Sequence, residues 1–256
     1  MEGKQKFQQK FILLRVVVVM SGAFLLSPVA GNVQPSVSYF VHTIAGPAFM
    51  AANLTFPQES ATHIRFGFNQ CGCRTTCFAV GPSCQAWSFI EAGVNASECR
   101  IIDKGPETTN LTKMTNATYY FKESSVGGKY TWAQDNLLYV ELENQYYLAP
   151  GRAQCAKIPG HRMLISHSND TYNFLIQYNS LYGRAHNFWV DLVKIADRLA
   201  QWGDGTNETH QPYHVHMDNT ATVEPYFVAW NHEYLHDVVD NSRSVLCQAN
   251  PLGVNW

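Results

Sequence analysis

The chain has 256 residues, 46% of them hydrophobic, which is enough to bury one large core or two small ones. Its formal net charge of -2 at pH 7 excludes a general electrostatic attraction to nucleic acids or acidic membranes. No phosphate-binding glycine loop and no motif context for a Ser-His-Asp triad is present. Partners must therefore be recognised at local sites.

Residues 1–31 have the pattern of a secretory signal peptide. Basic residues precede the apolar run 16–26, and small residues follow at 29–31. We expect cleavage after Gly31, an extracellular product and no membrane insertion of the mature chain. A signal anchor is the alternative because residues 12–14 lengthen the apolar run. A charge and a proline interrupt the roughly 20 residues that a span would need.

Six Asn-x-Ser/Thr triplets give independent support for export, since such triplets are acceptors for N-linked glycans. The predicted glycosylation sites are Asn53, Asn95, Asn110, Asn116, Asn169 and Asn207.

The first half of the mature chain predicts a small disulfide-rich core. Five of the seven cysteines lie between Cys71 and Cys99. The spacing Cys73-x3-Cys77 places two thiols on one face of a helical turn. Aromatic and β-branched residues predict strands around this turn, at 38–42, 62–68, 85–89 and 98–102. A helix clamped by two bridges onto two strands is therefore expected.

Three motifs here resemble the central part of a PAN/apple domain: Cys73-x3-Cys77, Cys84-Gln-Ala-Trp-Ser-Phe89 and Cys99-Arg-Ile. The resemblance implies an α+β module over residues 32–122, with Cys73 paired to Cys99 and Cys77 to Cys84. Four cysteines admit three pairings, so their spacing alone does not select one. The cysteines can equally be structural staples without any ligand site.

An odd number of cysteines leaves one without an intramolecular partner, and Cys71 is the candidate. It either forms a disulfide-linked homodimer or stays a buried free thiol.

Residues 110–131 are rich in Thr, Ser, Asn and Gly, which predicts a connector with its linker at 123–132 and a strand at 118–121. Beyond it we expect helices and strands of an α+β unit over residues 133–256. The predicted helices are 149–155 and 168–177, with Ser168 as a cap and Pro150 early in the first helix. The predicted strands are 137–142, 163–165, 188–192 and 225–230.

In their order, four features resemble a C-type lectin-like domain over residues 135–250. They are the helix ending at Cys155, Phe188-Trp-Val-Asp-Leu192, Trp202-Gly-Asp-Gly205 and Leu246-Cys247. The resemblance implies a Cys155–Cys247 disulfide and recognition of extracellular glycans or glycoproteins. We expect no enzymatic activity, because the one catalytic motif, at 232–236, lacks its context. The family's second disulfide is absent, since no cysteine stands near Tyr226 or Asp240.

In sugar-binding relatives, a calcium ion is held by a carboxylate-amide triplet, a later Glu and an Asn-Asp pair. The resemblance implies that the corresponding residues here are Asp218, Asn219, Glu224, His236 and Asp237. Calcium prefers oxygen ligands, and an imidazole is a poor substitute. Two alternatives remain: a weakened calcium site, or a solvated polar loop without metal.

Histidines suggest a different metal in the same region. His232-Glu-Tyr-Leu-His236 fits the H-E-x-x-H pattern of zinc hydrolases, but no third ligand follows it. A noncatalytic zinc site at His214, His216 and His236 is a further hypothesis, since imidazoles suit zinc better than calcium.

The sequence thus predicts a secreted, glycosylated recognition protein that binds carbohydrate. The first alternative is an extracellular protein-protein interaction module whose sugar site has degenerated, and the second is a zinc hydrolase.

Overall fold

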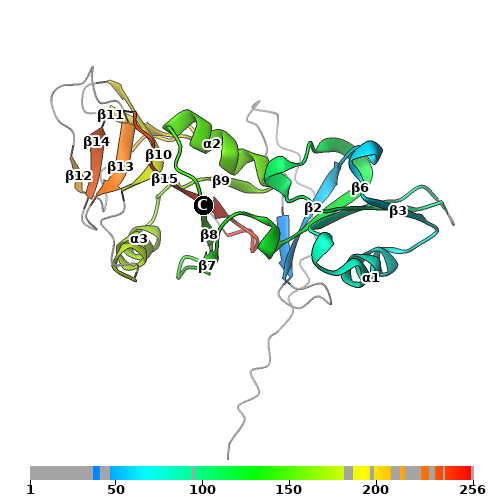
Figure 1. The fold of residues 1–256 in the computed structure, drawn as a ribbon. Helices are drawn as coiled ribbons and strands as arrows, with labels where there is room; N and C mark the ends of the chain where they lie inside the picture. Colours follow the sequence, from blue (N-terminus) through cyan, green and yellow to red (C-terminus); the bar gives the residue numbers. More distant parts are fainter. Residues whose placement is uncertain are drawn as a thin grey trace, which may run out of the picture. The chain divides into compact units, whose positions relative to one another are not determined.

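The computed structural model describes residues 37–40, 47–93, 96–181, 187–196, 199–208, 214–216, 226–230, 234–238 and 240–254. All of them belong to one compact unit, Gln34–Trp256. This unit contains a six-stranded sheet, a nine-stranded sheet and, within the described ranges, three α-helices (Figure 1). The predicted α+β class is confirmed. The signal peptide lies outside these ranges and stays a prediction, as do the domain boundaries.

The six-stranded sheet is antiparallel, with the strand order β1-β2-β6-β4-β5-β3 (Figure 1). Its strands are β1 (Val37–Phe40), β2 (Ala48–Thr55), β3 (His63–Phe66), β4 (Ala86–Ile90), β5 (Glu98–Ile102) and β6 (Thr112–Lys122). The predicted strands of this half are all present, whereas β2 was not expected.

The connector predicted at 110–131 is wrong over its first half, because β6 is an 11-residue strand in the middle of the sheet. The first half of β6 is mostly exposed, so it can be polar in composition while its backbone pairs with β2. β-branched threonine also suits a strand. The rest of the expected connector holds only short elements, a 3-10 turn at Glu123–Ser125 and the strand β7 (Tyr130–Trp132).

Helix α1 (Gln70–Val80) packs on the six-stranded sheet. It begins where the Asn69 side chain accepts a hydrogen bond from the Gly72 N–H at 2.8 Å, and Gly81 ends it with a φ of 75°. Disulfides join Cys73 to Cys99 and Cys77 to Cys84, the pairs that the PAN/apple resemblance implied. The helix is therefore attached covalently to β5 and to the segment just before β4.

The nine-stranded sheet has the order β12-β14-β13-β10-β15-β8-β7, with β11 paired to β10 and β9 paired to β15 (Figure 1). Its remaining strands are β8 (Leu138–Glu141), β9 (His161–Met163), β10 (Phe188–Ala196), β11 (Leu199–Trp202), β12 (His214–His216), β13 (Tyr226–Trp230), β14 (Tyr234–Val238) and β15 (Ser244–Ala249). Strand β15 is buried along its whole length.

Two helices accompany this sheet, α2 (Leu148–Lys157) and α3 (Asn169–Leu181), as the sequence predicts. The Ser168 hydroxyl accepts a hydrogen bond from the Thr171 N–H at 3.1 Å, so it caps α3 as expected. Cys155 on α2 forms a disulfide with Cys247 on β15. The helix, the closing strand and the bridge between them are thus the ones that the C-type lectin resemblance implied.

Large side chains fill the cores. Trp87 is 1% exposed, and Trp189 and Trp202 are 0% and 2% exposed. One hydrophobic cluster includes side chains from strands of both sheets, among them Phe49, Phe121 and Leu138. Within the described ranges, no helix is long and apolar enough to cross a membrane.

Candidate functional site

Two of the five predicted ligand residues, His236 and Asp237, lie on the edge formed by β12, β14 and β13. Asp218, Asn219 and Glu224 lie outside the described residues. His236 and Asp237 belong to β14, where His236 pairs with Val228 and Asp237 with Phe227 of β13. The structure thus places His236 and Asp237 on a strand, and the five-residue calcium site stays a prediction.

The histidines proposed as zinc ligands share this edge. Strand β12 runs parallel to β14, and the register pairs His216 directly with His236, while His214 pairs with Tyr234. In the part of the chain that the structure describes, no three His, Cys, Asp or Glu residues group as a metal site. Zinc binding therefore rests on the strand register alone and stays a prediction.

The H-E-x-x-H motif of zinc hydrolases requires a helix that brings its two histidines to one side. Tyr234–His236, the second half of the motif, instead lies in β14, where side chains alternate between faces. His232 and Glu233 are outside the described ranges. The local backbone at Tyr234–His236 is therefore wrong for a zinc-hydrolase helix.

The Trp202–Gly205 turn positions a carboxylate at the surface. The Asp204 oxygens lie 2.8 Å from His167 Nε2, 3.0 Å from the Thr206 N–H and 2.7 Å from the Thr206 hydroxyl. Burial acts to raise the pKa of Asp204, but hydrogen bonds from His167 and Thr206 outweigh it and lower the pKa below its ordinary value. Asp204 is thus held as an acceptor-only group.

An ion pair between a buried carboxylate and a partly exposed guanidinium lies beside this turn. Asp191 is 4% exposed and accepts hydrogen bonds from the Arg152 guanidinium on α2. Burial raises the pKa of Asp191 despite the attraction of Arg152. A Cβ at Gly203 would lie 2.0 Å from an Asp191 carboxylate oxygen, so only glycine permits the turn to approach. The conformation of the Trp202–Gly205 turn therefore depends on Asp191, a residue of the preceding strand.

A polar pocket of about 200 Å³ lies in the C-terminal half, between the start of α3, the residues before β8, and β15. Its lining includes Asp135, Arg162, His167, Asp170 and Gln248. It therefore offers carboxylates, an imidazole, a guanidinium and an amide within one small space. Such mixed donors and acceptors can bind the hydroxyl groups of a polyol.

Hydrogen bonds hold two of the side chains that line this polar pocket, Asp135 and Gln248. Asp135 accepts hydrogen bonds from the Tyr139 hydroxyl at 2.5 Å and the Thr171 hydroxyl at 2.8 Å. Gln248 is fully buried, and its Oε1 accepts from the Ile165 N–H at 2.8 Å. Its Nε2 has no hydrogen-bond partner among the described residues. A buried amide donor without an acceptor is costly, which leaves a bonding position for a ligand or a water molecule.

The sequence did not single out this polar pocket, because its lining comes from four separate segments. The one available signal was the Trp202–Gly205 motif, whose Asp204 lies 3.8 Å from Arg162 at the pocket. Asp240 accepts a hydrogen bond from the Leu148 N–H, at the start of α2, at 3.1 Å.

Five of the predicted glycosylation sites lie among the described residues, and all five are exposed. Carbohydrate attachment to them stays a prediction. They are Asn53, Asn110, Asn116, Asn169 and Asn207.

No protein-family model matches this chain, and no curated protein matches it. Solved structures that are similar to part of it are C-type lectins and lectin-like proteins. The C-type lectin CEL-I from Cucumaria echinata is 16% identical with a TM-score of 0.37, covering 46% of this chain and 93% of that one. Human lithostathine is 12% identical with a TM-score of 0.40, covering 48% of this chain and 96% of that one.

The cow C-type carbohydrate-recognition domain of CD23, in the presence of a GlcNAc2Man3 oligosaccharide, is 14% identical with a TM-score of 0.36. That match covers 46% of this chain and 91% of the other. These values are too low to place the chain in a family.

Proposed function

We infer that this chain is a secreted recognition protein whose C-terminal half binds carbohydrate. The observation that carries the proposal is the assembly of α2, β10 and β15 around the Cys155–Cys247 disulfide. A sheet held in this way supports the β12-β14-β13 edge, where the lectin resemblance implies a sugar site. Exposed acceptor sites for glycans and three disulfides support export.

Two places in this half suit a polyol. The first is the edge that carries His236 and Asp237. The second is the polar pocket, where the Gln248 amide lacks an acceptor. Calcium is proposed only for the first place, because the lectin resemblance groups the oxygen ligands Asn219 and Glu224 with His236 and Asp237.

A glycan array probed with the secreted, disulfide-bonded protein tests the proposal, with calcium and with a chelator. Asp237→Asn should abolish binding at the edge, whereas Asp170→Asn should abolish binding in the polar pocket. Asp103→Asn, an exposed change in the N-terminal half, serves as the matched control. Binding that the chelator and Asp237→Asn both remove assigns a calcium site. The absence of any glycan binding would overturn the proposal.

A second candidate is an extracellular protein-protein interaction module. Two large apolar side chains of the N-terminal half favour it, since Phe66 is 64% exposed and Phe78 is 55% exposed. Exposed apolar groups of this size are typical of interaction surfaces when they form a patch. Loss of glycan binding together with retained binding to an extracellular protein would select this candidate.

A further inference from the structure

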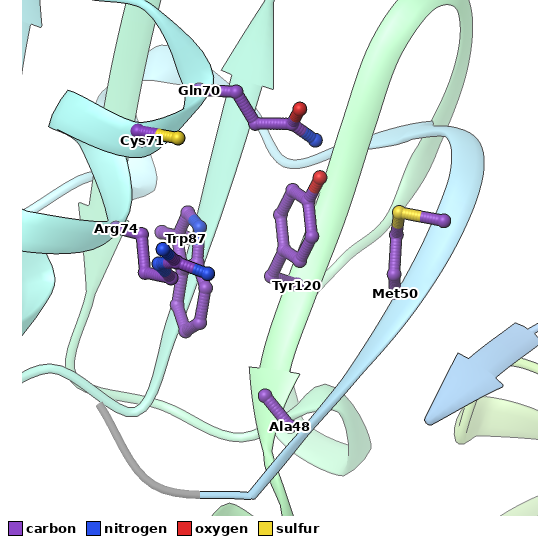
Figure 2. A pocket seen from close by; sticks show the side chains of 7 residues that line it. All are labelled: Ala48, Met50, Gln70, Cys71, Arg74, Trp87 and Tyr120. Carbon is purple, nitrogen blue, oxygen red and sulfur yellow. The ribbon is translucent and has the colours of Figure 1, made fainter. Parts of the chain in front are cut away.

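A second pocket lies in the N-terminal half, between α1 and the face of the six-stranded sheet (Figure 2). Its volume is about 260 Å³. Strands β2, β4 and β6 line one side, and the first turns of α1 line the other. The lining residues are Ala48, Met50, Gln70, Cys71, Arg74, Trp87 and Tyr120. None of them belongs to the lectin-like half, so this pocket is independent of the proposed carbohydrate site.

The sheet register builds the apolar side of the pocket. Tyr120 on β6 pairs with Met50 on β2 and with Trp87 on β4, which puts the three residues in one row across the sheet. Residues in one row point to the same face. The Trp87 and Tyr120 rings stack with centroids 5.0 Å apart and an interplanar angle of 5°.

The disulfides explain why the row is only partly covered. The Cys73–Cys99 bridge ties α1 to β5, on the far side of β4 from Met50. The helix therefore packs at one end of the row and leaves the other end open. Met50 at that end is only partly buried. A covalent constraint thus keeps the pocket from closing.

In the part of the chain that the structure describes, three polar atoms of the pocket wall have no hydrogen-bond partner: Arg74 Nε, Trp87 Nε1 and the Tyr120 hydroxyl. Trp87 is 1% exposed and Tyr120 is 7% exposed, so bulk water does not satisfy the indole N–H or the hydroxyl. Figure 2 shows the indole nitrogen and the hydroxyl at the ends of the two rings that lie nearer to α1. Buried donors without acceptors are rare and costly, which indicates a missing bonding partner.

The charge in the pocket is positive and comes from Arg74. Arg74 is the only charged side chain in its lining, and no salt bridge joins it to a carboxylate within the described ranges. The Arg74 charge acts on Tyr120: burial raises the pKa of this phenol to about 12, while Arg74 pulls it down. The phenol is therefore neutral at physiological pH. The pocket combines a guanidinium and an N–H donor with apolar walls.

We propose that this pocket binds a small organic carboxylate with a planar apolar body. The carboxylate accepts hydrogen bonds from Arg74 and from the Trp87 indole N–H, which supplies the missing acceptor. The body lies against Met50 and Ala48, beside the stacked rings. A pocket of this volume is smaller than most drug-sized sites, so it suits a single ring or a fused pair with a short acid arm.

Titration calorimetry on the full, disulfide-bonded protein tests this proposal with benzoate, phenylacetate and indole-3-acetate. We expect saturable binding of at least one of them with one site per chain. The neutral amide of the same acid should bind at least about tenfold more weakly, because it loses charge-assisted hydrogen bonds.

Arg74→Gln should weaken binding by a similar factor, since it keeps a polar N–H donor but removes the charge and the guanidinium group. The control is Arg65→Gln on β3, an exposed arginine that does not line the pocket. Trp87→Phe, which keeps a ring and removes the N–H, should also weaken binding.

Three results would overturn the proposal: no saturable binding of any of the acids, equal binding of acid and amide, or equal losses in Arg74→Gln and Arg65→Gln. Arg74→Gln keeps the test decisive even where Trp87→Phe fails to fold, because Arg74 is only partly buried, whereas Trp87 is a core residue. Glycan binding by the C-terminal half does not bear on any of these outcomes.

Discussion

Acidification below pH 6.5 should destabilise this fold through His161. The ring is fully buried. Its Nδ1 lies 3.0 Å from the Pro159 carbonyl oxygen, and its Nε2 lies 2.7 Å from the Tyr130 hydroxyl. A carbonyl oxygen only accepts, so Nδ1 carries the proton and Nε2 of the neutral ring accepts from Tyr130. The rings of Phe49 and Phe121 lie beside it, with centroids 5.4 and 6.4 Å away.

The size of the effect follows from the pKa. Burial lowers the pKa of His161 from 6.5 to about 4, although the hydrogen bond to Pro159 acts to raise it. Between pH 6.5 and 4, His161 is therefore protonated in the unfolded chain and neutral in the folded chain. Well above pH 6.5 the ring is neutral in both states, so its burial causes no pH-dependent loss of stability. Stability falls as the pH drops from 6.5 towards 4, by about 2 kcal/mol at pH 5 and about 3 kcal/mol once both states are charged.

Urea unfolding at pH 7.5 and at pH 5 measures this loss, with His161→Gln as the reference chain. Other groups titrate in the same range and act in the opposite direction. Burial raises the pKa of Glu107 and Asp191, so these carboxyl groups favour the folded state on acidification. The informative quantity is therefore the difference between the two chains. Glutamine does not titrate, so it should remove about 2 kcal/mol of the pH dependence.

The same change in unfolding free energy for both chains would refute this reasoning. Tyr130→Phe provides a second comparison, since it removes the hydroxyl that donates to Nε2 and keeps the aromatic packing. It should lower stability at pH 7.5 by about 1 kcal/mol.

Three other changes have defined outcomes. Replacing Cys155 and Cys247 with alanine should lower the unfolding free energy by about 4–5 kcal/mol, because the bridge spans 92 positions, and denaturant unfolding measures the loss. Arg152→Met should cost about 1–2 kcal/mol in the same assay, because it leaves the Asp191 carboxylate buried without its partner while Arg152 itself is 44% exposed. Cys71→Ser should abolish a dimer band in non-reducing gels, because Cys71 is the exposed cysteine outside the three disulfides.

Each of these three has a control. Removing Cys77 and Cys84 should cost only about 2–3 kcal/mol, since that bridge spans 7 positions, and an equal loss would contradict the chain-entropy account. Asp191→Asn should restore part of the stability that Arg152→Met removes, because the buried charge is gone. A monomer band for the unchanged protein, with and without reductant, would remove the linked dimer.

Local sequence patterns were enough to predict most helices and strands among the described residues. Ser168 and Pro150 marked the beginnings of α3 and α2, because caps and early prolines act within one helical turn. Alternating aromatic and β-branched residues marked β3 and β10 for a similar reason. The burial of Cys71 is the alternative that the structure overturns, since this cysteine is exposed. Its exposure depends on how α1 is attached, which spacing does not reveal.

The sites could be predicted only in part. The sequence drew attention to His236 and Asp237, but their pairing with β12 and β13 depends on strand register over long separations. It gave no indication of the pocket beside Trp87, where an arginine from α1 meets aromatic residues from two strands. Whether a buried N–H has an acceptor depends on every neighbour in space, so only the packed structure identifies it.

By itself, the sequence determined an α+β chain with an export signal pattern and a cysteine near each end of its later half, since these features are properties of composition and short-range periodicity. The tertiary structure decided the rest: that β6 runs through the centre of a sheet, that Gly203 must lack a side chain beside Asp191, and that Arg74 faces a pocket without a counter-charge. Each of these depends on contacts between residues distant in the chain, and such contacts exist only after the chain has packed.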